Sequence, residues 1–176
     1  MTRDRVPPDA LRVRRYEARD NEQVWALHWE GVLGTTRDYP VVDPKYDDDL
    51  TRLEEEYLGE GSNFWVAEGS DGLVGMAAVR RIDERTGRLR RMRVTEAWRR
   101  RGVAAALLAQ AIAFCRSCGY TRLILDTTEH QTAAQRMYER AGFNKTGERS
   151  LGSFVVYDYV LELETETRDR RQETGS

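Results

Sequence analysis

Apolar and polar residues change their spacing several times along this chain, and the changes predict a series of strands and helices. Near alternation of the two kinds predicts strands, whereas an apolar stripe at helical spacing predicts helices. The expected strands cover 11–18, 64–68, 73–82, 89–94, 120–126, a stretch from 143 onward and 153–163. The expected helices cover 20–34, 50–58, 102–118 and 131–140. The alternation in 89–94 is imperfect, with arginines between Leu89, Met92 and Val94.

The helix expected at 102–118 separates two strands, 89–94 and 120–126. It is long enough for a crossover that makes these two strands parallel. The second strand is apolar enough to predict a central position with both faces buried. Glycines end several elements, and we expect the first helix to stop at Gly31–Gly34.

Length and composition predict one soluble domain. A chain of 176 residues can bury a single core, and we place that domain at 11–163. Residues 1–10 predict a flexible arm, and 164–176 a disordered polar tail. With 33% charged residues and no apolar run of membrane-spanning length, a cytoplasmic location and no membrane partner are expected.

Arginines are concentrated in one stretch of a chain whose net charge is −2. Residues 88–101 hold seven arginines and one acid, Glu96. They lead to Gly102 and a run of small residues, so the unpaired amides that open the next helix are accessible to an anion. A site for phosphate or pyrophosphate is one interpretation, and a solvated arginine turn is the other.

Two motifs in this order resemble the Gcn5-related N-acetyltransferase (GNAT) superfamily. Arg99-x-x-Gly102-x-Ala104 is similar to its acyl-CoA signature, between a strand and a helix. Further on, Gln131-x-x-Ala134-x-x-x-Tyr138 with the later Gly-Phe pair is similar to its last helix and turn. The resemblance covers about 64–163. It implies an α/β fold of the α+β type, with a mixed, mostly antiparallel sheet of six to seven strands flanked by about four helices.

The same resemblance implies acetyl-CoA as the co-substrate. Its pantetheine would pair with the backbone of Met92 and Val94, one of which would donate to the thioester oxygen. Its pyrophosphate would rest on the amides that open the helix. Gln131 stands where the family more often has Asn. The cofactor-binding residues implied are Met92, Val94, Arg99, Arg100, Arg101, Gly102, Val103, Ala104, Ala105, Gln131 and Tyr138.

Tyr138 and Asp126 are the candidate catalytic residues. Tyr138 matches the tyrosine that protonates the departing thiolate, although its place on an apolar helix face also fits a packing role. Asp126, at the end of its strand, matches an acid that one branch of the superfamily uses as a base. Glu68, Glu129 and His130 are its rivals.

The predicted function is transfer of an acetyl group from acetyl-CoA to a primary amine of a small molecule or peptide, by direct attack. A non-catalytic module that binds acyl-CoA is the alternative, and a nucleic-acid binder ranks last because the basic stretch lacks interleaved aromatic residues. No metal is expected, since Cys115 and Cys118 are the only cysteines. Paired subunits are frequent in the superfamily, so a homodimer stays open.

Two features have both structural and functional interpretations. Eight acids lie between Asp43 and Glu60, against Lys45 and Arg52. They predict either helix caps and a solvated face or an acidic lip that attracts an amine, and we favour the first. His28 falls on the apolar face of the first helix, which favours packing over chemistry.

Overall fold

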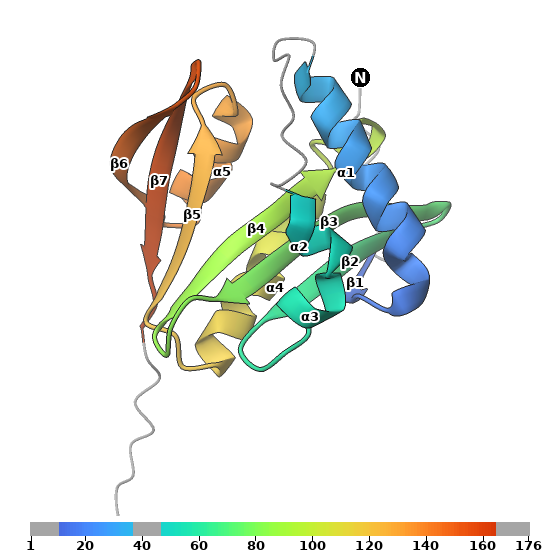
Figure 1. The fold of residues 1–176 in the computed structure, drawn as a ribbon, viewed down its shortest axis with the longest axis horizontal. Helices are drawn as coiled ribbons and strands as arrows, with labels where there is room; N and C mark the ends of the chain where they lie inside the picture. The colour runs from blue at the N-terminus through green and yellow to red at the C-terminus, as the bar shows by residue number, and fades with distance from the viewer. Residues whose placement is uncertain (1–10, 37–46, 165–176) are drawn as a thin grey trace, which may run out of the picture.

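The computed structural model describes residues 11–36 and 47–164, which form a seven-stranded sheet in the order β1-β2-β3-β4-β5-β7-β6 (Figure 1). The strands are β1 (Arg12–Arg15), β2 (Asn63–Gly69), β3 (Gly72–Arg81), β4 (Thr86–Val94), β5 (Arg122–Thr128), β6 (Asn144–Leu151) and β7 (Phe154–Glu162). The helices are α1 (Asn21–Thr36), α2 (Asp48–Thr51), α3 (Leu53–Tyr57), α4 (Val103–Ser117) and α5 (Thr132–Arg140), with 3-10 turns at Ala18–Asp20 and Glu96–Trp98.

This architecture confirms the predicted fold class. All neighbouring strands are antiparallel except β4 and β5, which are parallel and joined by the α4 crossover. The described residues contain five α-helices rather than four, because the one expected at 50–58 is divided in two. The predicted arm at 1–10 and all but the first residue of the predicted tail lie outside the described residues.

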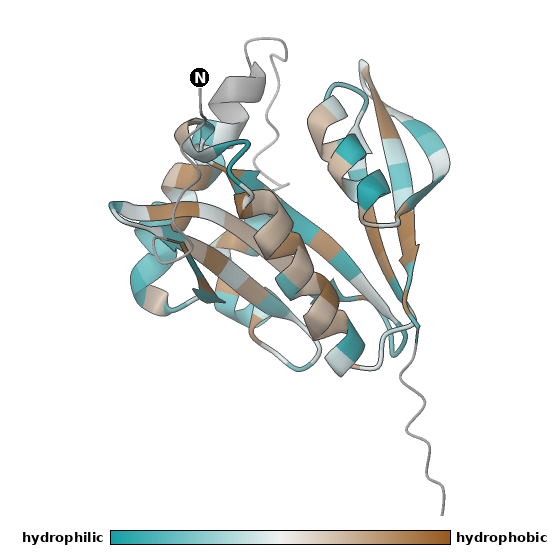
Figure 2. Cartoon of the chain, turned by 180° about the vertical axis from the view of Figure 1, so that it is seen from behind, coloured by the Kyte–Doolittle hydropathy of each residue, from teal (hydrophilic) through white to brown (hydrophobic). Residues whose placement is uncertain are grey.

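Helices cover the sheet on both faces, and each face has its own apolar core. On one face α4 and α5 pack over a cluster that includes Leu107, Leu123 and Tyr159. On the other face α1, α2 and α3 cover a smaller cluster around Tyr57 and Phe64. Brown apolar segments lie along α4 and the strands beside it in Figure 2. Because successive side chains of a strand point to opposite faces of the sheet, neighbouring residues of one strand contribute to different cores.

The structure corrects three local predictions. Helix α1 continues through Gly31 to Thr36, and the space left by the missing Cβ of Gly31 is filled by the side chain of Arg93. Helices α2 and α3 are separate because Arg52 has the non-helical dihedrals φ −114° and ψ 38°. Strand β5 is not buried on both faces: Asp126 is exposed, since α1, α2 and α3 lie over β2–β4 and leave this part of the sheet open (Figure 1).

Strands β4 and β5 are paired only at one end. Thr86–Arg88 pairs with Arg122–Ile124, and the remainder of β4 has no partner on its β5 side within the described residues. In Figure 1 the two strands meet at the bottom and diverge toward the top. The edge of β4 from Leu89 to Val94 is therefore available to an extended ligand.

An ion pair fixes β1 to the start of α1. Arg14 donates from both terminal nitrogens to the carboxylate of Asp20, at 2.8 Å each, and from Nε to Glu68 at 3.1 Å. Asp20 also accepts from the backbone N–H of Glu17 at 2.8 Å. The hydrogen bonds from Arg14 hold the pKa of this buried carboxyl below its usual value of 3.8.

We expect Asp20→Asn to lower the free energy of unfolding at pH 7 by about 2 kcal/mol, because it leaves a buried guanidinium with one anion fewer. The depressed pKa means that the carboxylate contributes fully above pH 4 and loses its contribution as the pH falls through the folded-state value. Urea unfolding at pH 7 and pH 3 should therefore show a smaller difference from the wild type at pH 3. Asp48→Asn, which breaks an exposed pair with Arg52, is the control. An equal difference at both pH values would contradict this account.

Candidate active site

A bulge interrupts β4 where the strand has already left β5. Met76 pairs with Arg93 and Ala78 pairs with Arg90, so Arg91 and Met92 both lie opposite Ala77. Arg91 has φ 56°, a left-handed conformation that costs a residue with a side chain about 1–2 kcal/mol. The bulge turns the following segment of β4, and the surrounding structure must hold it in place.

Buried acids hold the side chain of Arg91. Its guanidinium forms a short ion pair with Asp49, to which Nε also donates at 3.0 Å, and it lies 3.3 Å from Asp47. Tyr57 donates a short hydrogen bond to the same Asp49 carboxylate. Burial opposes ionisation of Asp49, but the hydrogen bonds from Arg91 and Tyr57 outweigh it and keep its pKa below the ordinary value. These acids are therefore internal counter-ions, which neither interpretation of the acidic stretch anticipated.

His28 of α1 closes this network from the other side. Its Nε2 lies 3.1 Å from Asp47, without hydrogen-bond alignment, and its Nδ1 is 3.5 Å from a terminal nitrogen of Arg91. Burial lowers the pKa of His28, so the ring is neutral at neutral pH. The ring packs against Trp25 and Trp29. This placement agrees with the predicted packing role of His28 on the helix face.

The segment between β4 and α4 presents unpaired backbone amides. Gly102 caps α4 with φ 84° and ψ 6°, and a Cβ there would meet nothing within 4 Å. The first bond of the helix runs from Ala106 N–H to Gly102 O at 3.0 Å. Within the described part of the chain, the amides of Val103, Ala104 and Ala105 therefore have no acceptor. Together with the positive end of the helix dipole, they can bind an anion.

Three consecutive arginines surround this helix start, and all are exposed. Arg99 donates from Nε to the carbonyl of Val94 at 3.4 Å, which ties the loop to the end of β4. Arg101 stacks over Trp98 with 5.3 Å between the guanidinium carbon and the ring centroid. Arg100 has φ 62°, and its side chain forms neither a hydrogen bond nor a stacking contact with the described residues.

Tyr138 of α5 is the buried phenol of the site. It is 5% exposed and packs against Phe143 and Tyr159, with ring centroids 5.6 Å and 6.4 Å away. Its hydroxyl has no hydrogen bond to any described residue. Burial raises the pKa of Tyr138 to about 12, while the charge of Arg93 acts in the opposite direction. The hydroxyl is therefore protonated throughout the neutral range and can donate a proton.

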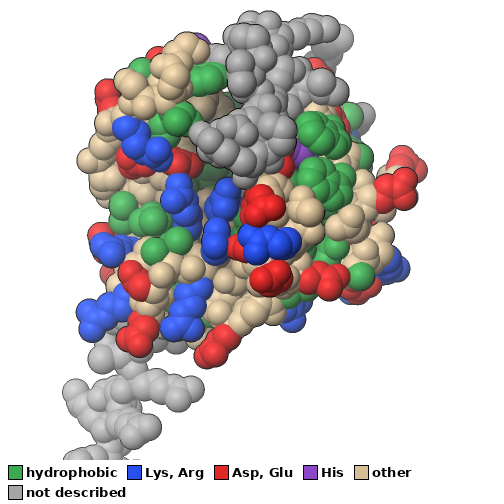
Figure 3. Space-filling view, viewed as in Figure 1, with side chains coloured by type: hydrophobic (Ala, Val, Ile, Leu, Met, Phe, Trp, Pro, Cys, Tyr) green, Lys and Arg blue, Asp and Glu red, His purple; other side chains and the backbone are tan. Residues whose placement is uncertain are grey.

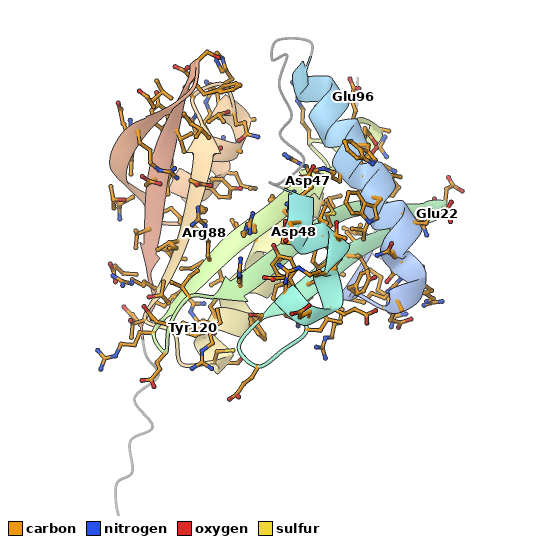
Figure 4. All side chains as sticks on the ribbon, in the orientation of Figure 1. Glu22, Asp47, Asp48, Arg88, Glu96 and Tyr120 are labelled. Atoms are coloured by element: carbon orange, nitrogen blue, oxygen red, sulfur yellow. The ribbon has the colours of Figure 1, made fainter. Side chains whose placement is uncertain are left out.

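Asp126 lies in an alternating cluster of charges on the open face of β5. Its carboxylate accepts from Arg88 of β4 at 2.7 Å and from Arg149 of β6 at 2.5 Å. Arg149 also pairs with Asp158 of β7, at 3.1 Å. The cluster connects β4 with β5, β6 and β7 beside a hollow of about 430 Å³. Figure 4 shows Arg88 on β4, directed toward the β5–β7 part of the sheet.

Gln131 uses its side-chain oxygen within the protein. Oε1 accepts from the hydroxyl of Thr127 at 2.6 Å and from the amide of Thr128 at 3.3 Å, which caps the turn between β5 and α5. The side-chain nitrogen of Gln131, Nε2, has no hydrogen bond to the described residues and can donate to a ligand. Contact of this residue with pantetheine therefore stays a prediction.

The structure brings most of the sequence-predicted residues around the divergence of β4 and β5. Met92 and Val94 lie on the free edge of β4 and pack against the core cluster that includes Tyr138 of α5, and Asp126 lies on β5. The rival bases lie elsewhere or are engaged. Glu68 pairs with Arg14, and Glu129 accepts from the amide of Val155 at 3.3 Å and lies 3.5 Å from His130.

Sequence reasoning missed Arg91, Arg93 and their surroundings. Figure 4 labels Asp47 and Asp48 at the start of α2, beside β4. The only signal for the bulge was the imperfect alternation in 89–94, where the apolar residues shift by one position. Nothing in the sequence indicated that acids from the segment before α2 would meet Arg91.

Comparison with known proteins gives the class of this site. Residues 13–143 match the model of the acetyltransferase (GNAT) family. Over 123 residues the chain is 37% identical to human N-acetyltransferase 8, covering 66% of this chain and 53% of that protein. It is 38% identical over 102 residues to N-acetylaspartate synthetase of Danio rerio, covering 57% and 36%.

Solved structures share the fold. An acetyltransferase from Streptococcus agalactiae superposes with a TM-score of 0.76 at 22% identity, covering 88% of this chain and 99% of that one. YncA of Salmonella typhimurium, solved with acetyl-CoA as its cofactor, gives 0.72 at 22% identity, covering 90% and 96%. The chain belongs to the GNAT family of acetyltransferases. It spans about half the length of the named relatives it matches first.

The described residues contain neither a group suited to hold a metal ion nor a helix suited to span a membrane. No group of three or more His, Cys, Asp or Glu side chains in 11–36 and 47–164 is arranged to hold a metal ion. None of the helices in the same ranges is long and apolar enough to cross a membrane.

The left-handed conformation of Arg91 predicts an unusual order of stability for two variants. Both Arg91→Gly and Arg91→Ala lose the ion pairs, but only glycine adopts φ 56° without strain. We expect Arg91→Gly to be more stable than Arg91→Ala by about 1 kcal/mol in urea unfolding. At the neighbouring Arg90, in ordinary strand conformation, the order should reverse, with glycine less stable than alanine by roughly 0.5 kcal/mol. The same order at both positions would refute the assignment of strain to the bulge.

Proposed function

We propose that this chain transfers an acetyl group from acetyl-CoA to a primary amine of a small molecule or peptide by direct attack. The observation that carries the proposal is the divergence of β4 from β5, directly before a helix whose first amides are unpaired. An extended pantetheine chain can pair with the free edge of β4. A pyrophosphate fits the helix start, because it is an anion at the positive end of a helix dipole.

The residues proposed to hold acetyl-CoA fall into two groups. Met92 and Val94 would offer backbone groups to pantetheine, and one of their amides would donate to the thioester oxygen as charge develops there. The amides of Gly102, Val103, Ala104 and Ala105 would hold the pyrophosphate. Arg99, Arg100 and Arg101 would add cations, which suit phosphate oxygens because a guanidinium donates in a planar fork.

Tyr138 is proposed as the general acid. When the neutral amine attacks the thioester carbonyl carbon, a carbon–nitrogen bond forms and the carbon–sulfur bond breaks. The thiolate takes a proton from Tyr138, the new amide nitrogen loses one to water, and the phenolate regains one from solvent. A phenol whose pKa is raised to about 12 carries that proton throughout the neutral range. Its burial beside the free edge of β4 supports this role, and its packing against Phe143 fixes the ring.

Asp126 stays a predicted base. Its carboxylate is exposed and paired with Arg88 and Arg149, so both ion pairs compete with an incoming amine for the same oxygens. An amine that arrives neutral needs no dedicated base. The names of the relatives, among them human N-acetyltransferase 8, support the reaction class without fixing the acceptor of this chain.

Acetyl-CoA binding can be tested at the helix start with a single added charge. Ala105→Asp places an acid in the first turn of α4, where it favours the helix dipole but repels a pyrophosphate. We expect the dissociation constant for acetyl-CoA in calorimetry to rise about tenfold or more, while the thermal midpoint stays equal or rises. Ala113→Asp, the same change at an exposed position later in α4, should leave binding unchanged. Equal effects of the two variants would argue against a pyrophosphate at the helix start.

The role of Tyr138 predicts a loss of rate that is independent of pH. Tyr138→Phe should lower kcat about 100-fold or more between pH 6 and pH 10, with the KM for acetyl-CoA little changed. The wild-type rate should rise with pH as the amine becomes neutral, without a fall from loss of the Tyr138 proton in this range. Tyr120→Phe is the matched control, because it removes a phenol hydroxyl that donates to Gly61 O at the far end of the sheet. A Tyr138→Phe enzyme with the wild-type kcat would remove the proposed acid.

The reaction itself is tested by incubating the protein with acetyl-CoA and a panel of amines and measuring free thiol. Release that depends on the amine, with a product heavier by one acetyl group, is the expected result. Tight binding of acetyl-CoA without release for any amine would favour the non-catalytic acyl-CoA-binding module. Absence of acetyl-CoA binding would overturn both.

A further inference from the structure

Arg93 is a half-buried cation that forms no ion pair with a described carboxylate, although the charge of Asp47 acts on it. Its Nε is fully buried and has no hydrogen-bond partner, and no carboxylate among the described residues forms an ion pair with its guanidinium. Burial lowers the pKa of Arg93 below the ordinary value, although a guanidinium stays protonated. A desolvated and unpaired charge destabilises a protein, so its presence indicates a partner that binds from outside.

The neighbouring helix is adapted to this side chain. Gly31 lies inside α1, where glycine costs roughly 1 kcal/mol relative to alanine. A Cβ at Gly31 would come within 2.8 Å of both Cδ and Nε of Arg93. The glycine therefore leaves room for the side chain of Arg93 between α1 and β4. Packing against α1 restricts the rotamer of Arg93.

Arg93 lies next to the proposed point of reaction. It is opposite Met76 on the α1 side of β4, in the segment that has left β5. Its charge is close enough to Tyr138 to act on the pKa of the phenol, and the phenol acts on that of Arg93 in return. A group bound by Arg93 is therefore within electrostatic range of the hydroxyl that would protonate the leaving thiolate.

This face of β4 has more cations than the described acids balance. Arg91 is paired with Asp47 and Asp49, and Arg88 with Asp126. Arg90 is 3.7 Å from Asp49, which Arg91 already engages. Figure 3 shows blue arginine and lysine side chains gathered at the centre of this face. Among the described residues, Arg90 and Arg93 are left with charge to offer a ligand.

We propose that Arg93, assisted by Arg90, binds a carboxylate of the acceptor, so that the acceptor is an amine bearing a carboxylate close to its nitrogen, such as a free α-amino acid. This inference rests on the proposed function. A single guanidinium fork matches a planar carboxylate in two parallel hydrogen bonds and fixes the direction of the attached amine. Because Arg93 lies on the segment of β4 that has left β5, this direction would bring the amine toward the thioester. Arg93 is therefore a binding residue that selects the acceptor.

The test compares amines that differ only in the carboxylate. Each α-amino acid is assayed beside its carboxamide, and kcat/KM is measured from thiol release. For the best acceptor we expect the acid to exceed the amide about tenfold or more. Arg93→Met should bring this ratio close to one, with the KM for acetyl-CoA unchanged. Arg80→Met, which removes a cation of the same face that pairs with Glu56, should keep the wild-type ratio.

A second variant covers a failure of Arg93→Met to fold. Gly31→Ala keeps every charge but displaces Arg93 by its new Cβ, and alanine favours the helix. Gly31→Ala should reduce the ratio of kcat/KM for the α-amino acid to kcat/KM for its carboxamide severalfold. The thermal midpoint of unfolding should stay unchanged. Equal rates for acids and amides in the wild type would overturn the inference. A rise in the KM for acetyl-CoA in Arg93→Met with an unchanged ratio would also overturn it, because Arg93 would then serve the co-substrate.

Binding separates this inference from the proposed function. Calorimetry in the presence of CoA measures the binding of N-acetyl-α-amino acids and of their carboxamides, which needs no turnover. If no amine releases thiol, the proposed reaction fails and binding alone decides. Preference for the acids by about tenfold or more, lost in Arg93→Met, supports the carboxylate site. Equal binding of acids and amides overturns it.

Discussion

The ion pair between Arg91 and Asp49 holds the bulge on which the geometry of the site depends. Arg91 has φ 56° in a strand, a strained conformation that the surrounding contacts must hold, and the bulge turns the segment of β4 that has already left β5. Burying these charges costs solvation free energy. The hydrogen bond from Tyr57 to Asp49 and the ion pair between Arg91 and Asp47 offset that cost. Strain in one residue is thus balanced by charges from a distant part of the chain.

The arginines of β4 have different partners, because the bulge in the strand changes the direction of their side chains. Arg88 joins the charge cluster that connects β5, β6 and β7, and Arg91 holds the bulge. Arg93 is left in a space that Gly31 opens in α1. A uniform basic surface for a polyanion would need these cations in water on one continuous face. Instead, each has a separate and partly buried environment, which fits a small ligand with a defined shape.

The proposed site has two sides along β4, one for the co-substrate and one for the acceptor. We propose that the unpaired amides at the start of α4 and the free edge of β4 hold the co-substrate, and that the α1 face of β4 receives the acceptor. Tyr138 of α5 belongs to the core cluster against which Met92 and Val94 of β4 pack. Because burial keeps the phenol protonated, Tyr138 has the protonation state that its proposed role as general acid requires.

The sequence by itself determined the order of elements, the parallel crossover and the helix start at Gly102, because each depends on residues that are neighbours in the chain. It also indicated Tyr138, through a motif carried by one helix. Only the tertiary structure decided the end of α1, the exposed face of β5 and the environments of Arg91 and Arg93. Gly31 looks like a helix end until Arg93 fills the space beside it, and Asp47 and Asp49 look like solvated acids until Arg91 meets them. Contacts between residues more than 40 positions apart leave no periodic pattern, so local sequence could not predict them.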